Sequence, residues 1–583
     1  MRLHVYSLSL SLSLSLLLCK STSTVWRALL GTLGTIAICA VCPAAAAPTV
    51  ERITFNGLVP YHTGKAPMRD EQGRTYVVVD FMPGAEAPYA EQARDALASF
   101  DPKRNREHPQ VLLLIEDYEK RFGIAPQYRV DERGNRQRSN VTTWVGASIA
   151  AYLTDGQIRA LRADKNVRLV TDVQPVEFSS PPWYPSWNGA PWGELNDWGW
   201  NAVAGKSVLS GSTRKVYIID SGVAYHSELG SVSLRLSVAP DMYPYDRWLV
   251  GCYTHATHVA GIIGATENNG TGRRGVYAGV NIVSITGGYD SWRYDALPSP
   301  RYCNNVPMGS MSSAEIGYAL DRVVADNLQP ANAVPKPHIV NLSMNPGAAT
   351  GFAGNGVAES NWTKILTLVT PTVYFAPFYY QHPGHVLVQS AGNFFADSCS
   401  TSNGTYGASY AFKTSAAAQS TTADGVIVVG AVNSQGKPVG GANGTFANAY
   451  PQFSDRPGGP NPYTFAGALG SNYGGCVDMW APGDFIYSTW GEGLNSTREN
   501  ASYVGGEPQA CASGGCVSSP QSGWAFLSGT SMAAPHVAAA AAYAADLYGL
   551  TTPAAIEQHL RNNLKPSYGN DAAGQPARMV QLQ

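Results

Sequence analysis

The stretch Val216-Tyr-Ile-Ile-Asp-Ser-Gly-Val223 joins a short apolar, β-branched run to a carboxylate and a glycine. Short, nearly continuous runs of this kind are typical of parallel strands that are buried on both faces. Helical patterns such as residues 313–326 lie between the runs. Three further runs share the pattern: residues 338–342, 386–389 and 426–429. The alternation predicts an α/β fold with a mainly parallel sheet flanked by helices.

Three residues with complementary chemistry stand next to these predicted elements. Asp220 ends the first run, His255 lies in the first turn of a predicted helix, and Ser531 opens an alanine-rich helix. Taken singly, each residue is more often a turn, packing or capping residue. Taken together, they supply the nucleophile, base and carboxylate that acyl transfer needs. An α/β-hydrolase would place Gly-x-Ser-x-Gly around the serine, and Ser531 lacks that pattern.

Three segments resemble the catalytic motifs of the subtilisin-like serine proteases, or subtilases: Asp220-Ser-Gly-Val, His255-Ala-Thr-His-Val-Ala-Gly and Gly529-Thr-Ser-Met-Ala-Ala-Pro. The similarity extends over residues 192–550. It implies that Asp220 orients His255, that His255 takes and returns a proton, and that Ser531 attacks the scissile carbonyl. The resemblance therefore predicts a serine endopeptidase that acts on polypeptides.

The same resemblance extends to an oxyanion hole and a substrate cleft. Ser390-Ala-Gly-Asn393 is similar to the segment with the family's oxyanion-hole asparagine, so Asn393 is expected to donate to the oxyanion. Ala256 stands where the family usually has glycine, and adds a methyl group beside the cleft. A second departure, Asn345 where glycine is common, weakens any substrate preference inferred by analogy. The expected substrate-binding residues are Ser343, Met344, Asn345, Ser390, Ala391 and Gly392.

Charge divides the rest of the chain into two blocks. Asp, Glu, Lys and Arg number 36 in residues 51–178 but only 43 in the much longer residues 179–583. Such a shift indicates a domain boundary, which we place at the proline-rich seam, residues 179–185. The first block predicts a small ferredoxin-like α+β unit in the order βαββαβ. Its expected strands are 75–81, 127–130, 142–153 and 167–171, and its expected helices are 111–122 and 154–164.

This first block, residues 147–164 above all, resembles the inhibitory propeptide of subtilases. The resemblance implies that residues 48–178 are a propeptide that inhibits and helps to fold its own catalytic domain, residues 179–583. The chain is then made as a self-processing zymogen.

The first 47 residues show the pattern of a signal peptide. Arg27 precedes an apolar run that is shorter than the roughly 20 residues of a membrane-spanning helix and ends in small residues. We expect a secreted protein, extracellular or periplasmic in a bacterium, with no membrane attachment after processing. An N-terminal membrane anchor is the alternative.

Six cysteines follow the expected signal: Cys252, Cys303, Cys399, Cys476, Cys511 and Cys516. An even number in an exported protein predicts disulfides, and all 15 pairings of six cysteines stay open. Cys511 and Cys516 form the one local pair that we predict to be bonded.

Composition and motifs also limit partners and cofactors. A net charge of −2 argues against nucleic-acid binding through a basic surface. Acyl transfer of this kind requires no cofactor, and we predict no metal site, although calcium is a common structural ligand in the family. His258 follows His255 by one helical turn, but the Glu of a His-Glu-x-x-His zinc site is absent.

Two other functions stay open: an exported esterase, and a catalytically silent subtilase-like binding protein.

Overall fold

The computed structural model describes residues 69–70, 72–101, 106–130, 136–173, 175–178, 194, 197–223, 226–238, 254–286, 311–346, 357–374, 380–393, 395–398, 422–443, 446, 470–490, 509–512, 515–518 and 523–582. All of them belong to one compact unit, residues 57–583. The predicted signal segment and the seam lie outside the described residues.

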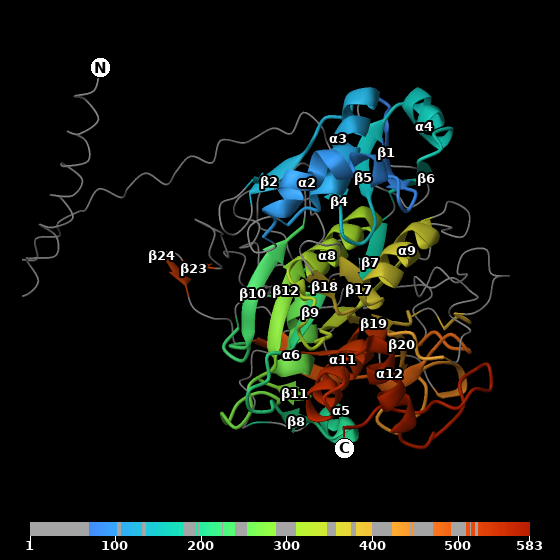
Figure 1. Ribbon diagram of the computed structural model, residues 1–583. Helices are drawn as coiled ribbons and strands as arrows, with labels where there is room; N and C mark the ends of the chain where they lie inside the picture. Colours follow the sequence, from blue (N-terminus) through green and yellow to red (C-terminus); the bar gives the residue numbers. More distant parts are fainter. Residues whose placement is uncertain are drawn as a thin grey trace, which may run out of the picture. The chain divides into compact units, whose positions relative to one another are not determined.

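A seven-stranded sheet forms the centre of the second block (Figure 1). All its neighbouring strands are parallel, which confirms the predicted α/β architecture. The four predicted runs form its central strands β9, β15, β19 and β20. The strand order is β10 (Val232–Ser237), β12 (Asn281–Thr286), β9 (Lys215–Asp220), β15 (Ile339–Leu342), β19 (Val386–Ser390), β20 (Val426–Val432) and β21 (Met479–Pro482).

Helices cover both faces of this sheet (Figure 1). Along β9, Val216 and Ile218 pack with α6 (Thr254–Gly264) and α11 (Thr530–Leu547). Their neighbours Tyr217 and Ile219 point the other way and pack with α8 (Ser313–Ala325) and α9 (Val357–Val369). Each aliphatic side chain buried in this way contributes about 1.5–3 kcal/mol. Alternate residues of a single strand therefore bind the two helical layers to one sheet.

The first block contains an antiparallel four-stranded sheet in the order β4 (Val141–Thr142), β5 (Ser148–Leu153), β1 (Thr75–Phe81) and β6 (Val167–Asp172). With α3 (Pro109–Phe122) and α4 (Asp155–Arg162), it follows the predicted βαββαβ order. Thr154 and Gln157 form a capping box at the start of α4.

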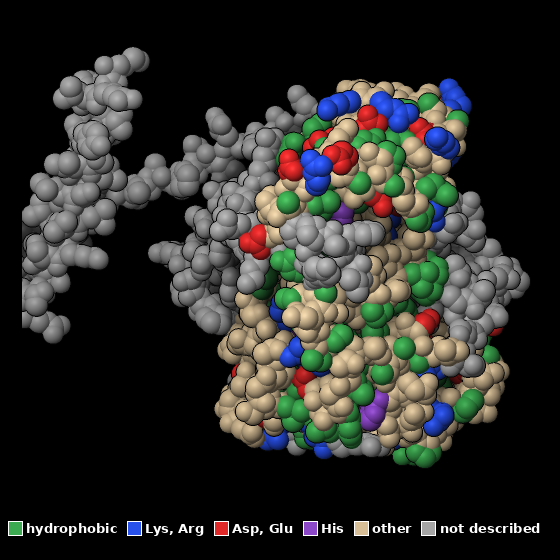
Figure 2. Space-filling view, in the orientation of Figure 1, with side chains coloured by type: hydrophobic (Ala, Val, Ile, Leu, Met, Phe, Trp, Pro, Cys, Tyr) green, Lys and Arg blue, Asp and Glu red, His purple; other side chains and the backbone are tan. Residues whose placement is uncertain are grey.

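Two expectations for this block are wrong in detail. The predicted strand 127–130 does not join the sheet: β2 (Tyr128–Val130) pairs with β3 (Arg136–Arg138) in a separate hairpin. The predicted strand 142–153 is divided into β4 and β5 by residues 143–147, of which 143, 144 and 145 donate their backbone N–H groups to Asp321, outside the sheet. In the view of Figure 2, charged side chains gather over this block around α2 (Ala90–Ala98) and α4, in agreement with its composition.

The first block packs against α8 and α9. Lys364 of α9 donates to Asp80 of β1 at 2.6 Å, and both side chains are buried. Asp321 of α8 accepts the backbone N–H groups of residues 143, 144 and 145 through one oxygen, Oδ1. Tyr76, Val78 and Trp144 share a buried apolar cluster with the two helices.

The last described strand of the first block, β7 (Pro175–Phe178), lies between β13 (Met311–Ser312) and β16 (Met344–Pro346) in a three-stranded antiparallel sheet. The remaining elements are η1 (Ala87–Tyr89), α5 (Trp198–Val203), β8 (Lys206–Ser207), β11 (Tyr277–Ala278), β14 (Gln329–Pro330), β17 (Thr372–Tyr374), β18 (Tyr380–His382), η7 (Gly441–Asn443), β22 (Ile486–Trp490), β23 (Gln509–Ala512), β24 (Gly515–Ser518), β25 (Gly523–Leu527) and α12 (Pro553–Asn562).

Candidate active site

Asp220 and His255 form a buried pair although they are 35 residues apart. Asp220 ends β9, His255 is the second residue of α6, and the His255 Nδ1 atom lies 2.9 Å from both carboxylate oxygens. A carboxylate only accepts hydrogen bonds, so in a neutral His255 the hydrogen resides on Nδ1. The lone pair of Nε2 is then the basic position of the ring, which is the arrangement that a general base requires.

Ser221 supports both members of this pair. Its backbone N–H donates to Asp220 Oδ1 at 2.6 Å. Its hydroxyl accepts the backbone N–H of Ala256 at 3.3 Å, which joins the end of β9 to the first turn of α6. Ala256, the departure from the family pattern, is fully buried in the core cluster that contains α6 and α11.

Ser531 is the second residue of α11 and exchanges hydrogen bonds with Ser343, which follows β15. The Ser531 hydroxyl donates to the Ser343 carbonyl at 2.9 Å, and the Ser343 hydroxyl donates to the Ser531 carbonyl at 3.0 Å. Pro535 explains the second bond: it has no N–H to offer the carbonyl four residues earlier, so the Ser531 carbonyl needs another donor. The proline thus allows the start of α11 to be joined to the end of β15.

Asn393 lies just after β19, and Thr530 fixes its side chain. The Asn393 Oδ1 atom accepts both the backbone N–H of Thr530 at 2.8 Å and its hydroxyl at 2.9 Å. Thr530 Oγ1 in turn accepts the backbone N–H of Gly392 at 3.0 Å. Because Thr530 holds the amide oxygen of Asn393, the Nδ2 group is the part of the side chain that is left to act as a donor, and its orientation is fixed by that of the oxygen. Sequence reasoning assigned no role to Thr530, although it directly precedes Ser531.

The two predicted substrate-binding stretches flank the start of α11. Ser343 and Met344 are fully buried, Met344 begins β16, and the side chain of Asn345 lies outside the described residues. Of the other stretch, Ser390 ends β19, Ala391 donates its N–H to Val429, and Gly392 has a φ of 103°, which favours glycine.

Strand β7 of the first block pairs with the first of these stretches. The Cα partners are Phe178 with Met344, residue 177 with residue 345, and residue 176 with residue 346. On its other side, β7 pairs with Met311 and Ser312. By its pairing with β16, β7 adds a strand to the edge that β16 offers, as an extended peptide does in β-strand addition. This edge begins one residue after Ser343, the residue that binds the Ser531 hydroxyl.

Three other histidines lie near Asp220, His255 and Ser531 in the sequence. His258 is fully buried and contacts the Ile486 carbonyl at 3.1 Å, as expected for a packed structural residue. His226 Nδ1 accepts the backbone N–H of Glu228. The His536 ring bonds to the Met532 carbonyl within α11, and its burial lowers its pKa well below the usual value. These contacts give each of the three histidines a structural role.

Within the part of the chain that the structure describes, no group of three or more His, Cys, Asp and Glu side chains is placed to hold a metal ion. Among the same residues, no helix is both long and apolar enough to cross a membrane.

Cys476 is disulfide-bonded, and its partner is not among the described side chains. Cys511 and Cys516 are Cα partners across the β23–β24 hairpin, but their side chains are not described, so their disulfide stays a prediction.

Comparison with known proteins gives three findings. The family described as the subtilase family matches residues 211–578. Proteins named subtilisin-like protease 2 from Arthroderma otae and Trichophyton rubrum are each 34% identical to the chain, over 113 and 110 residues, which is 19% of this chain and 20% of each relative. A cold adapted subtilisin-like serine proteinase of known crystal structure matches with a TM-score of 0.37 and 21% identity, over 66% of this chain and 98% of that one.

Proposed function

Because the chain belongs to the subtilase family, we propose that it is a serine endopeptidase with Ser531 as its nucleophile. The observation that carries this proposal is the buried contact between His255 Nδ1 and the Asp220 carboxylate at 2.9 Å. That contact leaves Nε2 as the base, which an acyl transfer to a serine requires. The family match includes all three residues.

The reaction begins when the Ser531 hydroxyl leaves the Ser343 carbonyl and turns to His255. As Oγ attacks the scissile carbonyl, His255 Nε2 takes its proton, and the Asp220 carboxylate stabilises the resulting imidazolium. The proton then passes to the leaving amine nitrogen, and the C–N bond breaks to leave an acyl-enzyme. Water, deprotonated by the same histidine, hydrolyses the ester and restores Ser531.

Asn393 serves this reaction as the oxyanion donor. Its amide oxygen is held by Thr530, so Nδ2 is the atom of this side chain that donates to the negative charge that develops on the substrate oxygen. A donor fixed in advance needs no reorganisation during the reaction. Removal of such a donor typically lowers kcat by about 10²–10³, a magnitude measured for subtilisin.

The first block acts as the inhibitory propeptide of this enzyme, in a chain that is made as a zymogen and exported. Three contacts support the proposal: the pairing of β7 with β16, the three backbone N–H groups bound to Asp321, and the buried pair of Asp80 and Lys364. The partners of the mature enzyme are polypeptide substrates and its own released propeptide. Structural calcium and the Cys511–Cys516 disulfide stay part of this proposal.

Intact-mass analysis after treatment with a serine-directed phosphonate tests the function. We expect one label, on Ser531, and neither labelling nor proteolysis in His255→Ala. A label on another residue, or unchanged proteolysis in His255→Ala, would contradict the triad. Cleavage of a simple aryl ester without cleavage of any protein substrate would favour an exported esterase. Absence of labelling in the processed protein would favour a silent binding protein.

A further inference from the structure

A second segment of the chain, residues 470–474, runs beside the loop that carries Asn393. Backbone hydrogen bonds join the two: Phe395 donates to the Gly470 carbonyl at 3.0 Å, and Tyr473 donates to the Ala396 carbonyl at 3.0 Å. The segment is itself anchored to the central sheet, because the Ser471 hydroxyl accepts the backbone N–H of Ala431 in β20 at 3.0 Å. The loop after β19 therefore rests on a support that is fixed to a neighbouring strand.

Asn472 is the residue of this segment that binds the loop on both sides of Asn393. Its Nδ2 donates to the Ala391 carbonyl at 2.9 Å, and its Oδ1 accepts the backbone N–H of Ala396 at 3.1 Å. Its own backbone N–H donates to the Gly392 carbonyl at 2.8 Å. The side chain is fully buried. Asn472 thus connects residues 391 and 392 to residue 396, and Asn393 lies between these positions in the loop.

The chemistry of this bridge is specific to an amide side chain. The Ala391 carbonyl needs a donor and the Ala396 N–H needs an acceptor, and an amide offers one of each in a plane. A carboxylate would bring an oxygen against the Ala391 carbonyl, and an alanine would leave both buried backbone groups without these bonds, which is unfavourable. The two partners also decide which atom of the Asn472 amide is the nitrogen.

We propose that Asn472 is a positioning residue for the oxyanion donor, and the inference rests on the role of Asn393 in the proposed function. Thr530 orients the Asn393 side chain, and Asn472 holds the backbone that carries it. Since the contact between Asn393 and the oxyanion is made only in the transition state, a loosened loop lowers kcat and leaves KM nearly unchanged. A residue with a purely structural role would lower stability without this separation of kcat and KM.

The test is a double-mutant cycle of Asn472→Ala and Asn393→Ala in the full-length chain, with mature active sites counted by phosphonate labelling. We expect Asn472→Ala to lower kcat by about tenfold with KM within about twofold, a size typical of coupled neighbouring residues. In the Asn393→Ala background, Asn472→Ala should change kcat by less than about twofold, because the donor that it positions is already gone. An equal loss in both backgrounds, or an unchanged kcat in Asn472→Ala, overturns the proposal.

Two further variants complete the experiment. Asn327→Ala is the matched control: Asn327 is a buried asparagine whose Nδ2 binds Tyr217 and the Val323 carbonyl, away from the loop, so it should lower Tm but not kcat. If the alanine variant does not fold, Asn472→Asp is used in its place, because it keeps the shape of the side chain. Its kcat, divided by that of the wild type, should rise as the pH falls, because a protonated carboxyl can donate to Ala391; a flat ratio contradicts the proposal.

The outcomes also separate this inference from the proposed function. If Asn393→Ala has the kcat of the wild type, the oxyanion assignment is wrong and the inference about Asn472 falls with it. If Asn393→Ala is impaired and Asn472→Ala is not, only the inference is wrong.

Discussion

Phe178 pairs with Met344 across the antiparallel strands β7 and β16. Met344 directly follows Ser343, whose carbonyl accepts the Ser531 hydroxyl. The end of the first block therefore pairs with a strand that begins next to a hydrogen-bond partner of the proposed nucleophile, and it does so in the extended conformation that proteases bind. Backbone pairing of this kind fixes the direction and register of the segment whatever its side chains. A segment so held is placed to be cut and then to stay bound as a product.

We predict that the chain cuts itself at the seam with Ser531. The cut should fall near residues 178–182, and after Phe178 rather than after Ser180. A cut after Ser180 would place Pro181 directly after the scissile bond, and a proline there removes the amide hydrogen and restricts the backbone. Ser531→Ala, expressed alone in a host without other exported proteases, should accumulate as the uncut chain without its signal. Gel analysis and intact mass measure this directly. Two fragments divided at the seam would instead indicate an outside enzyme.

Asp321 should govern how long the released first block stays bound. Its Oδ1 atom accepts three backbone N–H groups from residues 143–145, and burial raises its pKa to about 6. In Asp321→Ala these donors lose their acceptor, at a cost of about 1–3 kcal/mol for each one that water does not reach. We expect the lag between cutting and the appearance of proteolysis to shorten by about tenfold or more, since 1.4 kcal/mol is a factor of ten.

Asp321→Asn is the matched control for this prediction, because its amide oxygen still accepts from the same N–H groups. It should keep most of the lag and co-purify with the cut first block, whereas Asp321→Ala should not. Equal lags in the wild type and in Asp321→Ala would show that the other contacts of the first block, including Asp80 with Lys364, are sufficient for inhibition.

The central strands could be predicted because burial on both faces produces nearly continuous apolar runs, and that of β15 contains one polar residue, Asn341. The run of β12 likewise contains one, Ser284, and was not among the predicted runs. The Ser284 hydroxyl accepts the backbone N–H of Val223, just past Asp220. Strand β10 lies at the edge of the sheet and alternates apolar and polar residues, so it lacks such a run.

The proposed triad could be predicted from motifs, but the residues that hold the active-site loops in place could not. Thr530 contacts Asn393 across 137 positions of sequence, and Asn472 contacts Ala391 across 81. Thr, Asn and Ser are common at turns and caps, so nothing local distinguishes these residues. Only the pairing of distant segments in the folded chain reveals what they bind.

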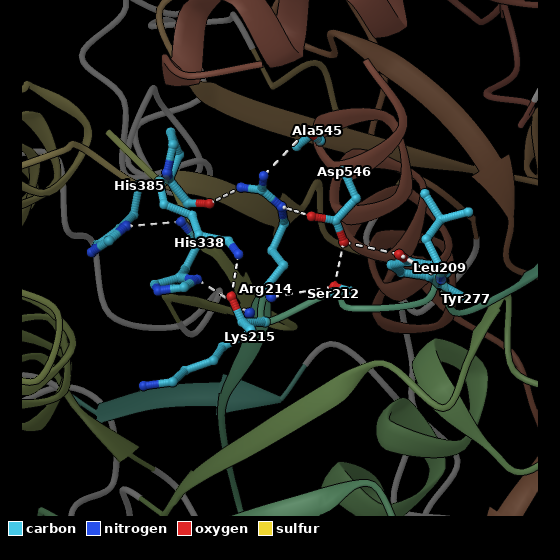
Figure 3. Close-up of polar contacts among 12 residues, drawn as sticks. Leu209, Ser212, Arg214, Lys215, Tyr277, His338, His385, Ala545 and Asp546 are labelled. Carbon is cyan, nitrogen blue, oxygen red and sulfur yellow. Dashed lines mark hydrogen bonds and ion pairs between the residues drawn. The ribbon is translucent and has the colours of Figure 1, made fainter. Parts of the chain in front are cut away.

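A cluster of three buried histidines should make the protein less stable in acid. His338 and His385, which Figure 3 shows beside each other, precede β15 and β19, at the opposite strand ends from Asp220. The His382 ring contacts the His385 ring. Burial lowers the pKa of all three, that of His382 to about 4, and the charges of Lys215 and Arg214 lower those of His338 and His385 further. Because these pKa values lie below the ordinary 6.5, the unfolded chain takes up protons first as the pH falls.

The free energy of unfolding should therefore be unaffected by these groups above pH 6.5 and should fall below that pH, by about 1.4 kcal/mol per pH unit for each histidine. The contribution of His382 should level off near pH 4. Urea unfolding at several pH values, in the Ser531→Ala background to prevent self-digestion, measures this. His385→Asn is the informative variant, since its amide oxygen can still accept the backbone N–H of His338 but does not titrate. An equally steep loss of stability in that variant would assign the acid sensitivity elsewhere.

The pocket for the residue before the cut should accept apolar or aromatic side chains and reject Lys and Arg. The stretches expected to form its walls, residues 343–345 and 389–393, contain no Asp or Glu, and a buried cation without a partner is strongly unfavourable. Phe178, the residue paired with Met344, has the expected apolar, aromatic character.

Phe178→Lys should slow self-cutting after this residue by about tenfold or more, because an unpaired buried charge costs several kcal/mol. Phe178→Leu should leave the rate of self-cutting nearly unchanged. Sequencing the new N-terminus identifies the bond that is cut, and a peptide library profiles the mature enzyme. A profile dominated by basic residues at that position would mean that a carboxylate from another part of the chain enters the pocket.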